Sequence, residues 1–387
     1  MKCKYLVRFI FIILPFLFVS CTGENRVLER EDLFILPLGY MADELNYFLK
    51  PDSQLPGTSD LFIREGRVFL SSSNAGKIME LNSYGDLLGF YYNPTINPEP
   101  AQYLSEDKEN PVIVRKWNFR GIDHLAVSDE YMLVADRVDE SQSMIEDRIL
   151  HNRIILRFDH KGQFVDYLGQ EGIQGSPFAY IQDLEITDNG EAVVLTRQCQ
   201  KQLVYWFSRQ GDLMYKIILD KENLPIMEEG GWSAGVPESL IPDRNAQKLY
   251  IKMDYFPVND SPDLKSVSRL YTLDLLEEKY TDFFTIATLE VEVNGQTLDG
   301  IYEYLGITSS GLHYFLGSDF SGRYHLILMD STGAVKVERV MFIEDSGILF
   351  RRFFLSADGL LAGIFYEPKG ARVSWWRTDK IADNYAQ

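Results

Sequence analysis

The sequence of 387 residues predicts an all-β protein, a six-bladed β-propeller of four-stranded antiparallel blades that is closed by an N-terminal strand. Two observations carry this prediction: short runs of alternating apolar residues along most of the chain, and a glycine-ended turn that recurs between them. The turn is clearest at Asp159-His160-Lys161-Gly162 and Ser208-Arg209-Gln210-Gly211, and Asn82-Ser83-Tyr84-Gly85 and Asp330-Ser331-Thr332-Gly333 repeat it. A recurring unit of four short strands is typical of radial arrays of small sheets.

Five units each contain four strand-like runs, and Gly, Asp, Ser or Asn residues separate the runs. Apolar and polar side chains alternate along each run, as in a strand with two different faces. In chain order the expected strands cover 61–63, 68–72, 77–81 and 87–91; 122–127, 131–136, 153–158 and 163–168; 181–187, 192–196, 202–207 and 213–219; 240–242, 248–254, 268–273 and 279–284; and 304–308, 312–317, 324–329 and 335–340.

The sixth unit offers only three runs, at 353–355, 360–366 and 372–377. A missing fourth strand would leave an open edge where the ring must close. The run at 32–38 near the N-terminus has the length and the apolar content to fill that place. We therefore expect this run to pair with 372–377.

The segment from 120 to 220 resembles the NHL-repeat family of six-bladed propellers. Asp123-His124-Leu125-Ala126-Val127-Ser128-Asp129 and Asp183-Leu184-Glu185-Ile186-Thr187-Asp188-Asn189-Gly190 resemble the repeat's inner strand and the turn after it. Gly169-Gln170-Glu171-Gly172 is similar to the family's Gly-x-x-Gly between blades. These motifs are structural turns, so the resemblance implies a fold and leaves the function open.

The N-terminus resembles a bacterial lipoprotein signal. Lys2, Lys4 and Arg8 precede an apolar stretch at 9–19, which is too short to span a bilayer comfortably. Phe18-Val19-Ser20-Cys21 is similar to a lipobox, with Phe18 where that motif usually carries Leu. The resemblance implies cleavage before Cys21 and attachment of lipid to this residue. An ordinary signal peptide with an incidental cysteine, or an uncleaved anchor, is the alternative.

On this interpretation residues 1–20 are a signal peptide, residues 21–29 a polar tether and residues 30–387 a single propeller domain. The protein would be a membrane-anchored lipoprotein of the bacterial cell envelope, outside the cytoplasm. Removal of Cys3 and lipidation of Cys21 would leave Cys199 alone, so no intramolecular disulfide is expected. Stability must then come from the core, for which 45% apolar residues provide the material.

The chain carries a net charge of −19 at pH 7. This excess of acidic residues argues against nucleic acid as a partner, because phosphates demand Lys and Arg. It equally argues against docking on anionic lipid through protein charge. The expected contact with the membrane is the N-terminal lipid.

The lengths of the connections between strands suggest which face of the propeller carries the functional residues. With the strands of a blade called A to D from the axis outward, the A–B and C–D links are tight. The long connections all fall at B–C or D–A, at 39–60, 92–119, 137–151, 220–239, 255–267 and 285–303. These two classes emerge on one face of a propeller, and function on scaffolded folds tends to lie on such loops. The alternative is that long loops are merely tolerated there.

Acidic and aromatic residues are interleaved in these loops. Such a surface suits cationic peptides, sugars or a protein partner, because aromatic rings supply apolar area and attract cations. The candidate binding residues are Trp117, Trp232, Asp139, Glu140, Glu228 and Glu229. A solvated acidic rim without a ligand is the simpler alternative.

Catalytic motifs are scarce, with no HExxH, P-loop or dinucleotide fingerprint. Asp123, His124 and Asp183 lie on expected innermost strands, and carboxylates near a propeller axis are suited to Ca²⁺. They are equally typical of repeat residues that cap turns, and no other cofactor is expected. Two functions remain: a lipid-anchored envelope protein that binds a protein, peptide or glycan, or a metal-dependent hydrolase, lyase or lactonase with its site in the channel.

Overall fold

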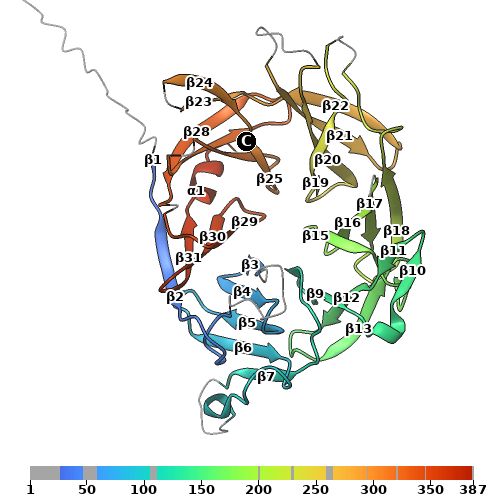
Figure 1. Ribbon diagram of the computed structural model, residues 1–387, viewed down its shortest axis with the longest axis vertical. Helices are drawn as coiled ribbons and strands as arrows, with labels where there is room; N and C mark the ends of the chain where they lie inside the picture. Colours follow the sequence, from blue (N-terminus) through green and yellow to red (C-terminus); the bar gives the residue numbers. More distant parts are fainter. Residues whose placement is uncertain are drawn as a thin grey trace, which may run out of the picture.

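The computed structural model describes residues 27–46, 59–104, 111–198, 201–227, 231–258, 265–293, 295–319, 321–344 and 346–385. Six antiparallel sheets are arranged around a central axis (Figure 1). The predicted six-bladed propeller is thereby confirmed. None of the described residues forms a helix that is long and apolar enough to cross a membrane.

Each blade has four principal strands, numbered here along the chain. Blade one contains β3 (Leu61–Arg64), β4 (Arg67–Ser72), β5 (Lys77–Leu81) and β6 (Leu87–Tyr92); blade two contains β8 (Leu125–Val127), β9 (Met132–Arg137), β12 (Arg153–Phe158) and β13 (Phe164–Gly169). Blade three contains β15 (Tyr180–Ile186), β16 (Ala192–Gln198), β17 (Lys201–Phe207) and β18 (Leu213–Leu219); blade four contains β19 (Val236–Pro242), β20 (Lys248–Tyr255), β21 (Val267–Asp274) and β22 (Lys279–Thr285). Blade five contains β25 (Glu303–Ile307), β26 (His313–Ser318), β27 (Arg323–Met329) and β28 (Val335–Phe342); blade six contains β29 (Phe350–Leu355), β30 (Leu361–Glu367), β31 (Gly370–Trp376) and β2 (Glu31–Leu36).

Three blades also carry a fifth, outermost strand that the sequence pattern does not predict. They are β1 (Val27–Leu28), which runs parallel to β28; β7 (Ile113–Lys116), parallel to β6; and β14 (Gly172–Ile173), antiparallel to β13. Two long connections contain hairpins of their own, β10 (Met144–Glu146) with β11 (Ile149–His151) and β23 (Leu289–Val293) with β24 (Gln296–Gly300). A single α-helical turn, α1 (Asp379–Ala382), follows the last strand among the described residues.

The N-terminal strand closes the ring as predicted. β2 pairs antiparallel with β31, with Phe34 opposite Val373 and Leu36 opposite Ala371. Asp32 fixes the register, since it accepts hydrogen bonds from Ser374 at 2.7 Å and from Arg372 at 2.6 Å. Within the predicted tether, β1 is already part of blade five, so ordered structure begins before residue 30.

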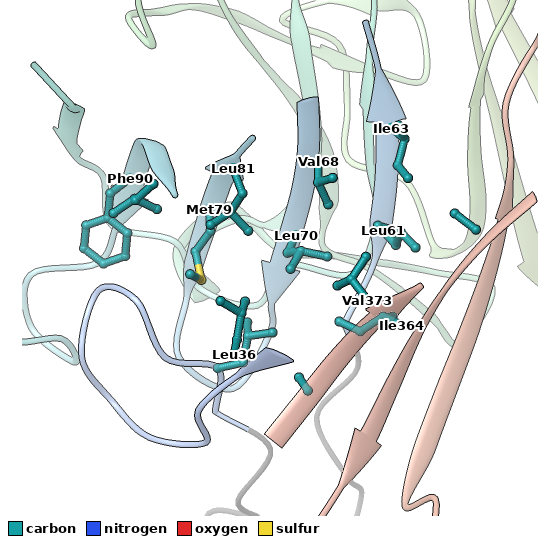
Figure 2. Close-up of a cluster of buried hydrophobic side chains, with 14 of the residues drawn as sticks. Leu36, Leu61, Ile63, Val68, Leu70, Met79, Leu81, Phe90, Ile364 and Val373 are labelled. Carbon is teal, nitrogen blue, oxygen red and sulfur yellow. The ribbon is translucent and has the colours of Figure 1, made fainter. Parts of the chain in front are cut away.

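The core lies between the blades. Buried apolar side chains of the described residues gather in six clusters, each shared by two neighbouring blades. Strand alternation produces this sharing, because successive side chains point to opposite faces of a sheet. On β4, Val68 and Leu70 face blade six while Phe69 faces blade two. Figure 2 shows the cluster at the closure, where Leu36 joins side chains of blades six and one.

Antiparallel pairing within the blades separates the connections onto two faces. The A–B and C–D turns form one face, which we call the tight-turn face. The B–C and D–A connections form the other, which includes 93–124, 138–152, 220–235, 256–266 and 286–302 and which we call the loop-rich face. Every innermost strand therefore starts at the loop-rich face and ends at the tight-turn face.

Candidate functional site

The innermost strands of all six blades enclose a channel with a cavity of about 570 Å³. Its lining reaches from Arg244, after the end of β19, to Gly300 and Phe350, near the starts of β25 and β29. The cavity thus extends from the tight-turn end of the channel to the loop-rich end. Its polar lining residues carry charges of both signs, which favours polar over purely apolar ligands.

One position of the innermost strand carries most of the polar chemistry. Each innermost strand has an apolar residue near its tight-turn end, and the position in question lies three residues before it. In chain order these apolar residues are Ile63, Val127, Ile186, Pro242, Ile307 and Leu355. Going around the ring, the residues at this position are Asp60, His124, Asp183, Ser239, Tyr304 and Arg352. The repeat geometry therefore brings residues far apart in the sequence to one level of the channel.

Four of these side chains form a connected group, which we call the axial network. Arg352 forms an ion pair with Asp60, and its Nη2 atom lies 3.5 Å from Oδ1 of Asp183. His124 Nδ1 lies 3.7 Å from Oδ2 of Asp60 and 3.9 Å from Oδ1 of Asp183. The network joins blades one, two, three and six, and its Arg352–Asp183 contact crosses the axis.

The axial network shifts the protonation of its members. Burial by itself would raise the pKa of Asp60, which is 4% exposed, but Arg352 and His124 outweigh it and hold that pKa at about 2. Burial would likewise lower the pKa of His124, but the nearby carboxylates of Asp60 and Asp183 raise it. The network thus favours the ionised form of Asp60 and the protonated form of His124.

Arg244 lies at the tight-turn end of the channel. It follows the last strand residue of β19 by two positions and is only 8% exposed. Its guanidinium donates to the carbonyl oxygens of Ile186 at 3.0 Å, Ile307 at 3.1 Å and Leu355 at 3.5 Å. These carbonyls belong to blades three, five and six, so one side chain from blade four ties the ends of three other innermost strands.

Glu185 lies beside this arginine inside the cavity. Its Oε2 atom is 3.7 Å from Nη1 of Arg244. Burial raises the pKa of Glu185 above its usual value, although the charge of Arg244 opposes the shift.

Two further polar groups of the lining have no protein partner among the described residues. They are Oε1 of Gln182 and Oγ of Ser239, both shielded from solvent. Buried polar atoms are nearly always hydrogen-bonded, either to protein or to an ordered small molecule. The channel therefore offers an unused acceptor and an unused hydroxyl to whatever occupies it.

The residues considered for a metal do not gather as one ligand set. His124 and Asp183 belong to the axial network, but Asp123 forms an ion pair with Arg153 instead. Among the described residues no group of three or more His, Cys, Asp or Glu side chains is arranged to hold a metal ion. The guanidinium of Arg352 lies where a cation between Asp60 and Asp183 would be placed.

The predicted binding residues are only partly brought together. Trp117 and Asp139 line one cavity of about 430 Å³ on the loop-rich face, together with Arg120 and Arg137. Glu140 follows Asp139 at the start of a short 3₁₀ helix (Glu140–Gln142). Neither Trp117 nor Trp232 lines the channel cavity. Trp232 lies in the 220–235 connection and forms a β-bridge with Pro257. Glu228, Glu229 and Cys21 lie outside the described residues.

Both tryptophans are half-buried rather than freely exposed. Trp117 stacks on Phe164 with ring centres 4.6 Å apart and meets Phe158 edge-on at 5.4 Å. Trp232 packs against the cluster between blades three and four. Replacing either ring would therefore disturb packing as well as any binding surface.

Sequence reasoning missed Arg244 and Arg352. Arg244 stands in the turn Asp243-Arg244-Asn245, a composition that is typical of solvated turns. Arg352 follows Arg351 in a strand whose alternation is weak. Aligning the six inner strands on their tight turns would have shown that Arg352 occupies the same position as Asp60, His124 and Asp183.

Comparisons with known proteins find only distant similarities and assign no activity. No protein-family model matches the sequence, and no similar sequence is found among curated proteins. A protein of unknown function from Bacteroides caccae is 13% identical, over 78% of this chain and 92% of its own, with a TM-score of 0.39. The β-propeller domain of the Trilobed protease from Pyrococcus furiosus is 11% identical over 83% of each chain, with a TM-score of 0.40. An α-L-arabinofuranosidase from Fusarium graminearum is 11% identical over 92% of this chain and 100% of its own, with a TM-score of 0.43. At this level the likeness is one of fold alone.

Replacement of Arg244 by Met should destabilise the protein by about 3 kcal/mol or more, because Glu185 and three buried carbonyls lose a charged partner at once. The free energy of unfolding, measured by urea titration, tests this expectation. Arg209→Met provides the matched control, because Arg209 is an exposed arginine that pairs only with Glu130 at the surface. Equal effects of the two substitutions would contradict a structural role for the channel arginine.

The axial network should also give the protein a specific acid sensitivity. Because the pKa of Asp60 is lowered from 3.8 to about 2, its stabilising contribution is complete above pH 3.8 and is lost as the pH falls through about 2. A shift of this size corresponds to roughly 2 kcal/mol. Asp60→Asn should therefore flatten the fall of unfolding free energy across this range, whereas Asp86→Asn, at an exposed position, should not. An unchanged slope in the Asp60 variant would rule the network out as the cause.

Proposed function

We propose that this protein is a lipid-anchored binding protein of the bacterial cell envelope, which uses its loop-rich face to bind a protein, peptide or glycan. The observation that carries the proposal is the asymmetry of the disc. Arg244 bridges the innermost strands of blades three, five and six at the tight-turn face, and the long connections surround the other end of the channel. We infer that a ligand reaches the channel cavity from the loop-rich face.

Further cavities on the same face support this assignment. The cavity of about 430 Å³ that contains Trp117 is built by the 93–124 and 138–152 connections. A smaller one of about 240 Å³ is lined by the end of β16, the start of β17 and residues between 219 and 226 and between 234 and 237. Long loops on a rigid scaffold are a common location of binding residues. Together with the channel, these cavities form a surface with several separate binding sites.

The anchoring part of the proposal rests on the sequence. Lys2, Lys4 and Arg8, the apolar stretch and the Ser20-Cys21 pair have the order of a lipoprotein signal. A lipid on Cys21 would hold the protein at a membrane outside the cytoplasm. The assignment of the blades to NHL-type repeats is likewise proposed from the motifs around Asp123, Gly169 and Asp183.

If Cys21 is lipidated, labelled fatty acid should enter the wild-type protein in cells, and Cys21→Ala should abolish the labelling. The variant should also leave the membrane fraction, because two or more acyl chains are needed for a stable anchor. Cys199→Ala is the matched control and should label like the wild type. Equal labelling of Cys21→Ala would end the lipoprotein assignment.

Shielding the loop-rich face should prevent binding. Polyethylene glycol attached through a single cysteine at Ile145 or Val258, both exposed on that face, should reduce capture of envelope components by the immobilised protein. The same polymer at Lys161, in a tight turn of blade two, should leave capture unchanged. Both derivatives use a Cys199→Ser background, and captured material is compared by mass spectrometry. Loss of capture from Lys161 alone would place the working surface on the other face.

A further inference from the structure

A small groove on the loop-rich face lies between blades three and four. It has a volume of about 240 Å³ and is lined by the end of β16, the start of β17, the end of β18, residues between 221 and 226, and residues 234–237 at the start of β19. The bottom is formed by Leu219, which is buried, and by Leu224 and Pro225, which are half-buried. The chemistry of this groove differs from that of the rest of the surface.

Its charged lining residues are all cations. Arg197, Lys201 and Lys221 are exposed, and none of them forms an ion pair with an acidic residue in the described part of the chain. No acidic side chain of the described residues lines the groove. In a protein with 57 acidic and 38 basic residues, this arrangement concentrates unpaired positive charge at one point. Such a site attracts carboxylates, which Arg and Lys bind through charge-assisted hydrogen bonds.

A buried acceptor lies beside these cations. Gln202 is 7% exposed, and its Oε1 atom has no hydrogen-bond partner among the described residues. Strand pairing places it next to Arg197 on β16 and next to Leu219 on β18. A buried acceptor without a donor is unfavourable, and a ligand N–H group would satisfy it.

An apolar surface adjoins the charged end of the groove. Ile226 is 72% exposed and Val236 is 52% exposed, and both line the groove. Val236 pairs with Asp254, which leads to the exposed Phe256 and Val258. Contiguous exposed apolar side chains of this kind mark interaction sites.

We propose that this groove binds the C-terminal end of a partner polypeptide whose last residue is apolar. The terminal carboxylate would be held by Arg197, Lys201 and Lys221, the last backbone N–H would donate to Gln202, and the last side chain would occupy the apolar part. The last residue of a polypeptide carries both a carboxylate and an amide N–H. The carboxylate matches the cations of the groove, and the N–H matches its one unpaired acceptor, Oε1 of Gln202. Capture of a C-terminal carboxylate is an established mode of peptide recognition.

The size of the groove supports a chain end over a larger ligand. Its volume is below the range of about 300–1,000 Å³ that is usual for small-molecule sites, yet it has room for one apolar side chain. This inference rests on the proposed use of the loop-rich face for binding and specifies the partner for one part of it.

Synthetic peptides test the proposal directly. Fluorescein-labelled pentapeptides of the form Gly-Gly-Ser-Ala-X, with X as Leu, Ile, Val, Phe, Ser or Lys, are titrated with the detergent-solubilised full chain and followed by fluorescence anisotropy. We expect the four apolar-ended peptides to bind, and C-terminal amidation to weaken them about tenfold or more by removing the charged acceptor. Equal binding of acid and amide, or no binding by any peptide, would overturn the proposal.

Variants of the groove separate recognition from folding. Arg197→Glu with Lys221→Glu should weaken the acid peptides about tenfold or more and leave the melting temperature nearly unchanged, since both side chains are exposed. Gln202→Leu should weaken binding while keeping or raising stability, because it removes an unsatisfied buried acceptor. Lys161→Glu on the tight-turn face is the control, and an equal loss of binding in it would overturn the proposal.

The outcomes also distinguish this proposal from the broader one. If no peptide binds but polymer on Ile145 or Val258 still prevents capture, the groove assignment fails and the binding face stands. If apolar-ended peptides bind but the polymer has no effect on capture of envelope components, the groove assignment stands. The proposal that the loop-rich face captures envelope components then fails.

Discussion

Charged side chains at the axis connect blades that do not otherwise touch. Neighbouring blades share apolar clusters, but opposite blades have no such interface. The contact from Arg352 of blade six to Asp183 of blade three crosses the channel, and Arg244 of blade four reaches a carbonyl of blade six. Each guanidinium offers several donors in a fixed plane, so one side chain can bind groups from several strands. The ring is therefore held both between neighbours and across its centre.

The fold was largely predictable because its signals are local. Alternation of side chains identifies a strand without knowledge of its partner, and the glycine-ended turns fix where strands stop. The closing strand was predictable for a different reason, since a sixth blade with three strands needs a fourth. The outermost strands β1, β7 and β14 were not predictable, because two to four residues at a sheet edge show too little alternation to be recognised.

The candidate sites were harder to predict, because their chemistry depends on contacts between blades. Asp183 and His124 were singled out as residues of inner strands, but the cation beside Asp183 comes from Arg352, about 170 residues further along the chain than Asp183. Net charge likewise does not describe each part of the surface. The chain has a charge of −19, yet the charged residues that line its groove between blades three and four are all cations. An average over the sequence does not describe one surface.

The pairing of β2 with β31 sets the order in which the molecule can be completed. Residues 31–36 are among the first to leave the ribosome, and their partner at 370–376 is among the last. Until then the N-terminal strand has no place in any sheet, and the first and last blades expose the surfaces that later meet. A chain that stops before residue 370 therefore resembles an unfinished ring with two open ends. Such products present an unpaired edge to proteases and chaperones, so the closing sheet also distinguishes complete molecules from incomplete ones.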